Sequence, residues 1–365
     1  MGNTPAPPLK GRGATFNPGN RFRRDTREAV DDGWREAAEG EDEPLPPLKT
    51  VVMIQQSRTI IAHNDSPDIP FTQSINPYQG CEHGCIYCYA RPSHAYLDLS
   101  PGLDFETRLF AKPEAAAMLR KELAKPAYRC EVMAMGTNTD PYQPIEREWK
   151  LTRQVLEVLA ECNNPVAIVT KSALIERDID ILAAMAAKKL ARVFLSITTL
   201  DKELARTMEP RAASPQRRLA AVKALSAAGI PVGVMTAPII PALNDKDMEA
   251  ILEASVANGA RHAAWVMLRL PHEVKDLFKD WLQQHYPLRA EHVMSILRQT
   301  RGGRENDPNF GSRMRGEGAF AQLIERRFQI ACQRLGLNEE RAPLDTSQFR
   351  APVLMPANPQ MDLFG

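Results

Sequence analysis

Hydrophobic and polar positions along the middle of the chain change their period repeatedly, and these changes predict alternating strands and helices. Short apolar or β-branched runs predict six strands, over residues 71–76, 131–136, 166–170, 192–198, 232–236 and 262–270. Helical periodicity predicts five intervening helices, over residues 113–124, 146–161, 176–188, 215–228 and 245–258. Repeated strand–helix units of this kind are typical of a parallel sheet with right-handed crossovers. We therefore expect an α/β fold, a partial (β/α)6 barrel that stays open because eight units are needed to close one.

The two ends of the chain lack this alternation. Residues 1–69 begin with segments rich in Pro, Gly and charge, which predict an extended N-terminal arm, partly disordered, in which residues 27–38 could form a short helix. Residues 70–270 form the predicted barrel. Helical patterns over 271–285, 290–299 and 318–335 predict a helical cap over residues 271–340, and residues 341–365 read as a flexible tail.

Composition adds two constraints. The 365 residues carry a net charge of only +1, so contact with nucleic acid would need a local patch. No apolar run approaches the roughly 18 residues of a membrane span and the N-terminus has no secretory signal, so we expect a cytoplasmic protein without membrane contact. Three of the six cysteines fall within residues 81–88, which indicates metal binding rather than a disulfide framework.

The three clustered cysteines have a distinctive spacing, Cys81-x3-Cys85-x2-Cys88, directly after the first predicted strand of the barrel. A cubane iron–sulfur cluster normally takes four thiolates. Three thiolates leave one iron open, and the amino and carboxylate groups of S-adenosylmethionine can chelate it. The alternative is a structural zinc site with His83 or His94 as the fourth ligand. That reading is disfavoured because zinc ligands usually come as two separated pairs, and we predict a [4Fe–4S] cluster.

The longer segments NPYQGCEHGCIYCYARPSHAY and GTNTDPYQPIE resemble radical S-adenosylmethionine (radical SAM) enzymes, in particular the branch related to spore photoproduct lyase, also called DNA repair photolyase-like. The resemblance covers roughly residues 74–337. It implies a radical SAM barrel, S-adenosylmethionine as cosubstrate and reductive cleavage to a 5′-deoxyadenosyl radical. It also implies an electron donor of the flavodoxin or ferredoxin type.

The same resemblance assigns cosubstrate-binding residues to the ends of the predicted strands. It implies that Asn138, Thr139 and Asp140 hold the methionine amino group, although such residues also favour plain turns. Lys171 would pair with the methionine carboxylate unless it is a surface lysine. Ser196 would reach the ribose, and Ala237 would lie beside the adenosine.

Two tyrosines flank Cys88. In the resembling lyase, tyrosines in matching places are thought to relay a hydrogen atom, so Tyr87 and Tyr89 are candidate catalytic residues. The alternatives are adenine packing for Tyr87 and a core position for Tyr89. That lyase also has a hydrogen-donor cysteine after its second strand, where this chain has Met135-Gly136. The spare cysteines 130 and 162 are predicted at the opposite end of the barrel, so thymine-dimer cleavage by that donor chemistry is doubtful.

Charged side chains outside the cysteine motif suggest further contacts. A glycine-rich loop carries Arg301, Arg313 and Arg315 with Phe310, which could grip phosphates and stack on a base, or could simply be structural. Glu209 could bind a ribose hydroxyl or substrate, whereas Arg217 and Arg218 read as a charged outer face.

The C-terminal residues QMDLF resemble the pentapeptide that binds the bacterial sliding clamp, with Gln360 for a polar pocket and Leu363 and Phe364 for an apolar one. The alternative is a tail that docks on its own domain. Together these features predict an enzyme that abstracts hydrogen from a macromolecule, such as damaged DNA. Radical modification of RNA or protein is the alternative enzyme, and a metal-bearing nucleic-acid-binding protein is the alternative without catalysis.

Overall fold

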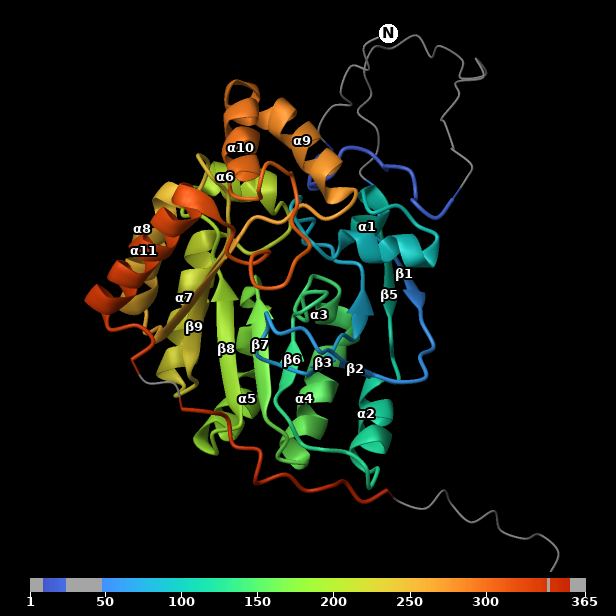
Figure 1. Ribbon diagram of the computed structural model, residues 1–365. Helices are drawn as coiled ribbons and strands as arrows, with labels where there is room; N and C mark the ends of the chain where they lie inside the picture. The colour runs from blue at the N-terminus through green and yellow to red at the C-terminus, as the bar shows by residue number, and fades with distance from the viewer. Residues whose placement is uncertain (1–8, 24–47, 340–341, 355–365) are drawn as a thin grey trace, which may run out of the picture.

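A seven-stranded sheet forms the centre of the molecule in the computed structural model, which describes residues 9–23, 48–339 and 342–354 (Figure 1). Its strand order is β10-β9-β8-β7-β6-β3-β2, and all neighbours pair in parallel except β2 with β3. The strands are β2 (Ile61–His63), β3 (Gln73–Ile75), β6 (Met133–Met135), β7 (Val166–Thr170), β8 (Ala191–Ser196), β9 (Val232–Ile239) and β10 (His262–Met267). The six parallel strands are the predicted ones, and the α/β partial barrel is confirmed.

Helices between the strands cover the outer face of this sheet (Figure 1). They are α2 (Ala115–Leu123), α3 (Glu146–Trp149), α4 (Leu151–Glu161), η2 (Ala173–Asp178), α5 (Ile179–Ala187), α7 (Pro215–Ala227), η3 (Asp245–Asp247) and α8 (Met248–Ala257). Helix α6 (Lys202–Met208) instead lies beyond the carboxyl ends of the strands (Figure 1), where Leu204 and Met208 share a core with Trp281. Local sequence explains the ends of these helices. The Ser214 side chain accepts a hydrogen bond from the Arg217 amide, and Pro215 occupies the first helical turn of α7. Apolar side chains of helices and strands then meet in one core, in which Leu156, Val193 and Leu195 are fully buried.

A second, three-stranded sheet lies before and beside the barrel and was not predicted. Its order is β1 (Val51–Ile54), β5 (Arg108–Ala111) and β4 (Tyr78–Gln79). The two-residue β4 ends directly before the cysteine motif, and Tyr78 pairs with Ala111 of β5. The short η1 (Arg91–Leu97) and α1 (Leu103–Thr107) connect the motif to β5. This sheet therefore fixes where the cysteine loop begins.

Part of the N-terminal arm, which we expected to be extended and partly disordered, packs on the folded core. This part is residues 9–23, in which Ala14 is buried. Its side chains reach the cap, since Thr15 donates a hydrogen bond to Asp280 at 2.6 Å and Arg21 pairs with Glu273 at 3.0 Å. The helix considered for residues 27–38 lies outside the described residues.

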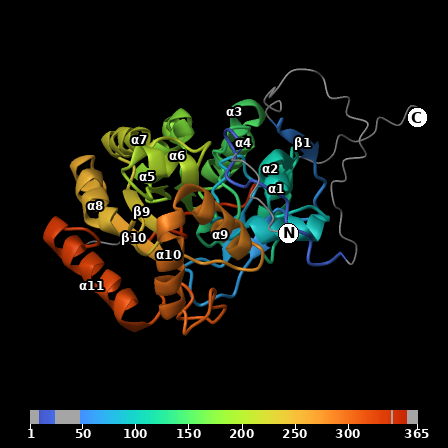
Figure 2. The same ribbon diagram turned by 90° about the horizontal axis from the view of Figure 1, so that it is seen from above.

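The C-terminal helices are present as predicted but do not form one cap. Helices α9 (Val274–His285) and α10 (Pro287–Gln299) lie over the end of the barrel, whereas α11 (Gly318–Leu335) lies beside α8 (Figures 1 and 2). Its buried Ile324 and Phe328 share a core with Trp265 of β10. Within the described part of the chain, no helix combines the length and the apolar character needed to cross a membrane.

The predicted flexible tail is also partly bound to the barrel. Residues 342–354 cross the end of the sheet where the parallel strands begin (Figure 1). The Asp345 amide donates to the Lys189 carbonyl at 3.0 Å, the Arg350 amide donates to the Cys162 carbonyl at 2.8 Å, and Phe349 packs on Tyr128. The clamp-binding candidates Gln360, Leu363 and Phe364 lie outside the described residues.

Candidate functional site

The three clustered cysteines lie on a loop at the carboxyl end of the parallel strands, where the chemistry of such folds is found. All three thiols are free; Cys81 and Cys85 are buried and Cys88 is partly exposed. The Cys81 amide donates to the Phe105 carbonyl at 2.9 Å, which fixes the start of the loop. Gly84 has a φ of +65°, a left-handed conformation that glycine adopts without strain.

The Arg91 side chain binds backbone carbonyl groups of this loop and holds it in place, and sequence reasoning missed this residue. Its guanidinium is fully buried and donates to the carbonyl oxygens of Cys85 at 2.9 Å and Gly84 at 3.1 Å. It also pairs with the buried carboxylate of Glu106. Because these bonds fix the backbone between two of the cysteines, they orient the thiols. Only its position three residues after Cys88 could have drawn attention to it.

The N-terminal arm binds the same carboxylate as Arg91. The amides of Gly13 and Ala14 donate to the Glu106 carboxylate at 3.0 Å and 2.9 Å. A Cβ atom on Gly13 would lie 1.8 Å from the carbonyl oxygen of Gly84. The arm, Glu106, Arg91 and the cysteine loop are therefore one packed unit.

The chemistry of this loop fits an iron–sulfur cluster better than zinc. Within the described residues, no three His, Cys, Asp or Glu side chains could hold one metal ion, whereas a cubane takes each thiolate at a different iron. His94 is buried with Nε2 at 2.9 Å from the Arg108 carbonyl, and burial lowers its pKa to about 4. His83 Nδ1 lies 3.3 Å from Asp140. Burial raises the pKa of the Cys85 thiol to about 12, so a thiolate there needs a compensating metal charge.

Tyr87, Glu209 and Arg218 form a buried chain of polar contacts beside the cluster loop. The Tyr87 hydroxyl donates to Glu209, Thr198 donates to the same carboxylate oxygen at 3.0 Å, and Arg218 pairs with the other oxygen. Arg218 also donates to the Ser196 carbonyl at 2.8 Å. The expectation that Arg218 belongs to a charged outer face was therefore wrong. Glu209 uses both oxygens within the protein and acts here as the anchor of Tyr87.

Lys171 follows β7 and faces the cluster loop, not the outer surface. Its ammonium lies 5.7 Å from the centre of the Tyr87 ring. Burial lowers the pKa of Lys171, but its electrostatic interactions with Cys85 and Glu209 outweigh burial and raise the pKa. Lys171 therefore keeps its positive charge, and an ammonium group beside the cluster loop can bind a carboxylate.

Asp140, which we expected to hold the methionine amino group, has several contacts within the protein. Its carboxylate accepts hydrogen bonds from Thr170 at 2.6 Å, the Lys171 amide at 2.8 Å and the Tyr142 amide at 2.9 Å, and it faces His83. Burial raises the Asp140 pKa, but the charge of His83 and these hydrogen bonds lower it to about 2. Both oxygens are thus engaged by the protein, and Asp140 ties the cluster loop to the end of β7.

The other predicted cosubstrate residues lie at neighbouring strand ends. The amides of Asn138 and Thr139 donate to the Asn76 side chain at 3.2 Å and 3.4 Å, and sequence reasoning did not single out Asn76. The Ser196 hydroxyl donates to the Ala237 carbonyl at 3.2 Å, which joins two predicted residues across β8 and β9.

Tyr89 lies at the open mouth of the barrel, so the alternative of a core position was wrong. Its side chain is 51 % exposed and its hydroxyl donates to the Thr137 carbonyl. The Arg269 guanidinium lies 5.8 Å from the centre of its ring. The two candidate tyrosines therefore differ, with Tyr87 buried against Glu209 and Tyr89 accessible to a ligand.

The arginines of the 301–315 loop, which we expected to grip phosphates, make contacts within the protein. Arg301 is buried and donates to the Leu268 carbonyl at 2.6 Å. Arg315 donates to the Trp265 carbonyl at 2.9 Å and stacks on that indole ring. Arg313 pairs with Asp68, which precedes β3. Because the loop is fixed to β10 and reaches the segment before β3, it bridges the open side of the barrel.

Phe310 of the same loop remains a candidate for stacking. It is 58 % exposed, and the Arg313 guanidinium lies 4.3 Å from its ring centre. Cys130 and Cys162, which lie outside the cluster motif, are remote from the mouth of the barrel, as predicted. Cys130 contacts Asn164 at 3.4 Å, and the Cys162 carbonyl binds the tail, both at the opposite end of the strands.

Comparison with known proteins agrees with this geometry. The model of the Radical SAM superfamily matches residues 75–254. An uncharacterized protein of Mycobacterium tuberculosis is 36% identical over 287 residues, which span 78% of this chain and 81% of that protein. An uncharacterized protein of Methanocaldococcus jannaschii is 29% identical over 58% of this chain and 76% of its own length.

Among solved structures, spore photoproduct lyase complexed with dinucleoside spore photoproduct has a similar fold. It aligns with a TM-score of 0.56 at 17% identity, over 78% of this chain and 80% of the lyase. A mutant of that lyase was solved with bound S-adenosylmethionine and aligns with a TM-score of 0.55. At this identity the similarity shows the fold alone.

Proposed function

Because the chain belongs to the radical SAM superfamily, with a [4Fe–4S] cluster and S-adenosylmethionine as cofactors, we propose that it abstracts hydrogen from a macromolecule, with damaged DNA as the favoured substrate. The observation that carries the proposal is the loop of three free cysteines, which Arg91 and Glu106 hold at the carboxyl end of the strands. When bound, the cluster supplies one electron that cleaves the sulfonium bond and yields a 5′-deoxyadenosyl radical.

The chain's own residues bind and orient the cofactors in this proposal. Cys81, Cys85 and Cys88 hold the cluster. Lys171 pairs with the methionine carboxylate, which its retained positive charge supports. Among the remaining residues, Asn138, Thr139, Ser196 and Ala237 line the cosubstrate, and Asp140 positions the cluster loop through His83.

The proposed DNA substrate rests on the mouth of the barrel. Tyr89 and Phe310 are exposed there, and aromatic rings stack on unpaired bases of any sequence. Spore photoproduct lyase, which has a similar fold, was solved with dinucleoside spore photoproduct, and this makes damaged DNA the first substrate to test. The end of β6 offers no thiol, so a different hydrogen donor, for which Tyr89 is the candidate, would close the reaction.

An anaerobic preparation of the full chain tests the enzyme. We expect about four irons per chain, the count of a cubane, and release of 5′-deoxyadenosine on reduction. The Cys85→Ala variant is expected to lose both, and Cys332→Ala, on α11, serves as the matched control. A preparation that holds zinc and never cleaves the cosubstrate would instead support a metal-bearing nucleic-acid-binding protein.

Product analysis decides the substrate. The reduced enzyme is incubated in parallel with ultraviolet-irradiated DNA, with undamaged DNA and with transfer RNA. Repair products that appear only from irradiated DNA support the proposal, whereas modified RNA or modified protein supports the alternative.

We also propose that the QMDLF segment brings the enzyme to a sliding clamp in the cytoplasm. The Leu363→Ala/Phe364→Ala variant should lose retention on immobilised clamp.

A further inference from the structure

A basic pocket lies on the side of the cluster loop that faces away from the mouth. It has a volume of about 460 Å³ and is lined by the loops that follow β6, β7 and β8. His83, which lies between two of the cluster cysteines, lines this pocket. The charged side chains of the lining are four arginines and one glutamate: Arg147, Arg177, Arg211, Arg217 and Glu176. Tyr89, Arg269 and Phe310 of the mouth are not among its lining residues.

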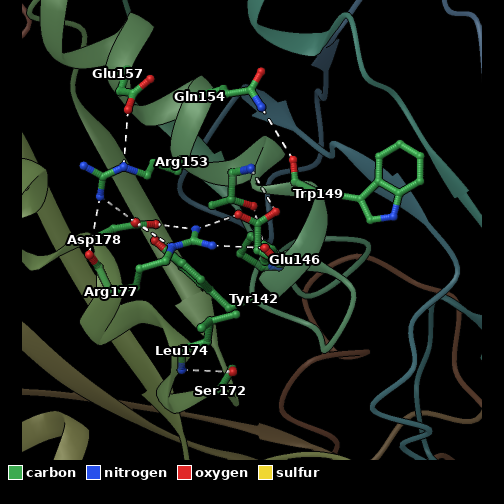
Figure 3. A network of polar contacts seen from close by, with 12 residues as sticks. Tyr142, Glu146, Trp149, Arg153, Gln154, Glu157, Ser172, Leu174, Arg177 and Asp178 are labelled. Carbon is green, nitrogen blue, oxygen red and sulfur yellow. Dashed lines mark hydrogen bonds and ion pairs between the residues drawn. The ribbon is translucent and has the colours of Figure 1, made fainter.

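The acids that balance these arginines lie mostly beneath the surface. Arg177 binds the fully buried carboxylates of Glu146 at 2.6 Å and Asp178 at 2.9 Å (Figure 3). Arg211, whose side chain is 37% exposed, binds the buried Glu82 at 3.0 Å. Arg177 already binds two carboxylates, so the donors available to an anionic partner from outside are those of the exposed Arg147 and the remaining N–H groups of Arg211 and Arg217.

Arg211 connects this surface directly to the cluster loop. Its amide donates to the His83 carbonyl at 3.3 Å, and its guanidinium binds the side chain of Glu82. Both residues lie between Cys81 and Cys85. A partner that binds the pocket would therefore rest against the segment that carries two of the three cluster ligands.

We propose that this pocket is the docking site of a small acidic electron-transfer protein, which passes one electron to the cluster and is itself oxidised by one electron. The inference rests on the proposed function, because the cluster must be reduced while substrate and cosubstrate occupy the mouth. A donor that binds on the His83 side leaves the mouth open. Electron-transfer encounters are typically small, and complementary charge steers them, which suits an arginine-lined pocket.

Charge reversal on the full-length enzyme tests this site. In the Arg147→Glu/Arg217→Glu variant, 5′-deoxyadenosine release is measured with reduced flavodoxin, with reduced ferredoxin and with dithionite, a small reductant that needs no docking site. We expect the rate with at least one protein donor to fall about 10-fold or more at low salt. The rate with dithionite should be unchanged.

Arg334→Glu is the matched control, because Arg217 and Arg334 are 51% and 58% exposed and each pairs with one glutamate. It should leave every rate at the wild-type value. Equal losses with protein donors and dithionite, or no loss with either, would overturn the proposal. The proposal would also be overturned if the wild-type enzyme were active with dithionite but with neither protein donor. The same holds if the Arg147→Glu/Arg217→Glu variant lost oligonucleotide binding but kept its rates with the protein donors. Failure of wild-type enzyme with dithionite would instead refute the proposed function.

Discussion

Gly13 of the N-terminal arm packs against Gly84 of the cluster loop so closely that a Cβ atom on Gly13 would lie 1.8 Å from the Gly84 carbonyl oxygen. The arm and the loop are far apart in sequence, yet the arm binds Glu106 directly and the loop is joined to Glu106 through Arg91. Any side chain at position 13 must therefore displace either the arm or the loop that carries the cysteines.

We expect Gly13→Ala to lower iron content and to destabilise the protein by about 1–3 kcal/mol, the usual cost of overpacking. Iron per chain and the cubane absorbance after anaerobic reconstitution, together with thermal unfolding, measure both effects. Gly19→Ala is the control, because nothing lies within 4 Å of a Cβ atom there. Wild-type iron content in Gly13→Ala would show that the arm does not support the cluster.

Arg91→Lys should be more severe. Lysine keeps the charge but cannot reach the carbonyls of Cys85 and Gly84 and the Glu106 carboxylate together. Weakening a fully buried ion pair is expected to cost about 3–5 kcal/mol, as measured in chemical denaturation. The exposed Arg120→Lys serves for comparison and should be neutral. A stable Arg91→Lys protein that retains its cluster would contradict the role we assign to Arg91.

These buried charges mark the limit of what the sequence could predict. The strand periodicity located all six parallel strands, since each is an apolar run between turns. It missed β4, which has only two residues and pairs with β5, a strand some thirty residues later in the chain. It also read Arg218 as solvated, because an arginine beside a helix N-terminus usually is. Only the folded chain brings Glu209 within reach of Arg218 and Tyr87.

Substitutions of the two tyrosines beside Cys88 should have different effects on stability and on product formation. Tyr87→Phe removes a donor from the buried Glu209 and should lower the free energy of unfolding by about 1–3 kcal/mol. Tyr89→Phe removes an exposed hydroxyl and should leave stability unchanged while product formation per 5′-deoxyadenosine falls. Calorimetry and the ratio of the two products measure the effects. Equal product ratios in wild type and Tyr89→Phe would exclude Tyr89 as the hydrogen donor.

Placing a cysteine at Gly136 should not create a spore photoproduct lyase. Gly136 has a φ of +86°, and a Cβ atom there would lie 1.9 Å from the Val169 carbonyl oxygen. The Gly136→Cys protein is expected to lose cosubstrate cleavage, because the ends of β6 and β7 must separate. The assay follows thymine recovery from spore photoproduct together with 5′-deoxyadenosine. Efficient repair by this variant, or by the wild type, would show that our assignment of the missing donor is wrong.

Arg313 and Asp68 provide a test of the 301–315 loop, because their ion pair bridges the open side of the barrel. Asp68 also accepts a hydrogen bond from the Gly311 amide at 2.7 Å, so each partner holds the same loop. If the contact is structural, Arg313→Ala and Asp68→Ala should destabilise the protein non-additively, with a coupling energy of about 0.5–3 kcal/mol in a double-mutant cycle.

Oligonucleotide affinity in a salt titration separates this structural role from phosphate binding. Removing a phosphate contact lowers the dependence of affinity on salt, whereas removing Phe310 lowers affinity at every salt concentration. We therefore expect Phe310→Ala to weaken binding and Arg313→Ala to leave the salt dependence unchanged. A smaller salt dependence in Arg313→Ala, with no coupling to Asp68, would return the arginine to the role of a phosphate ligand.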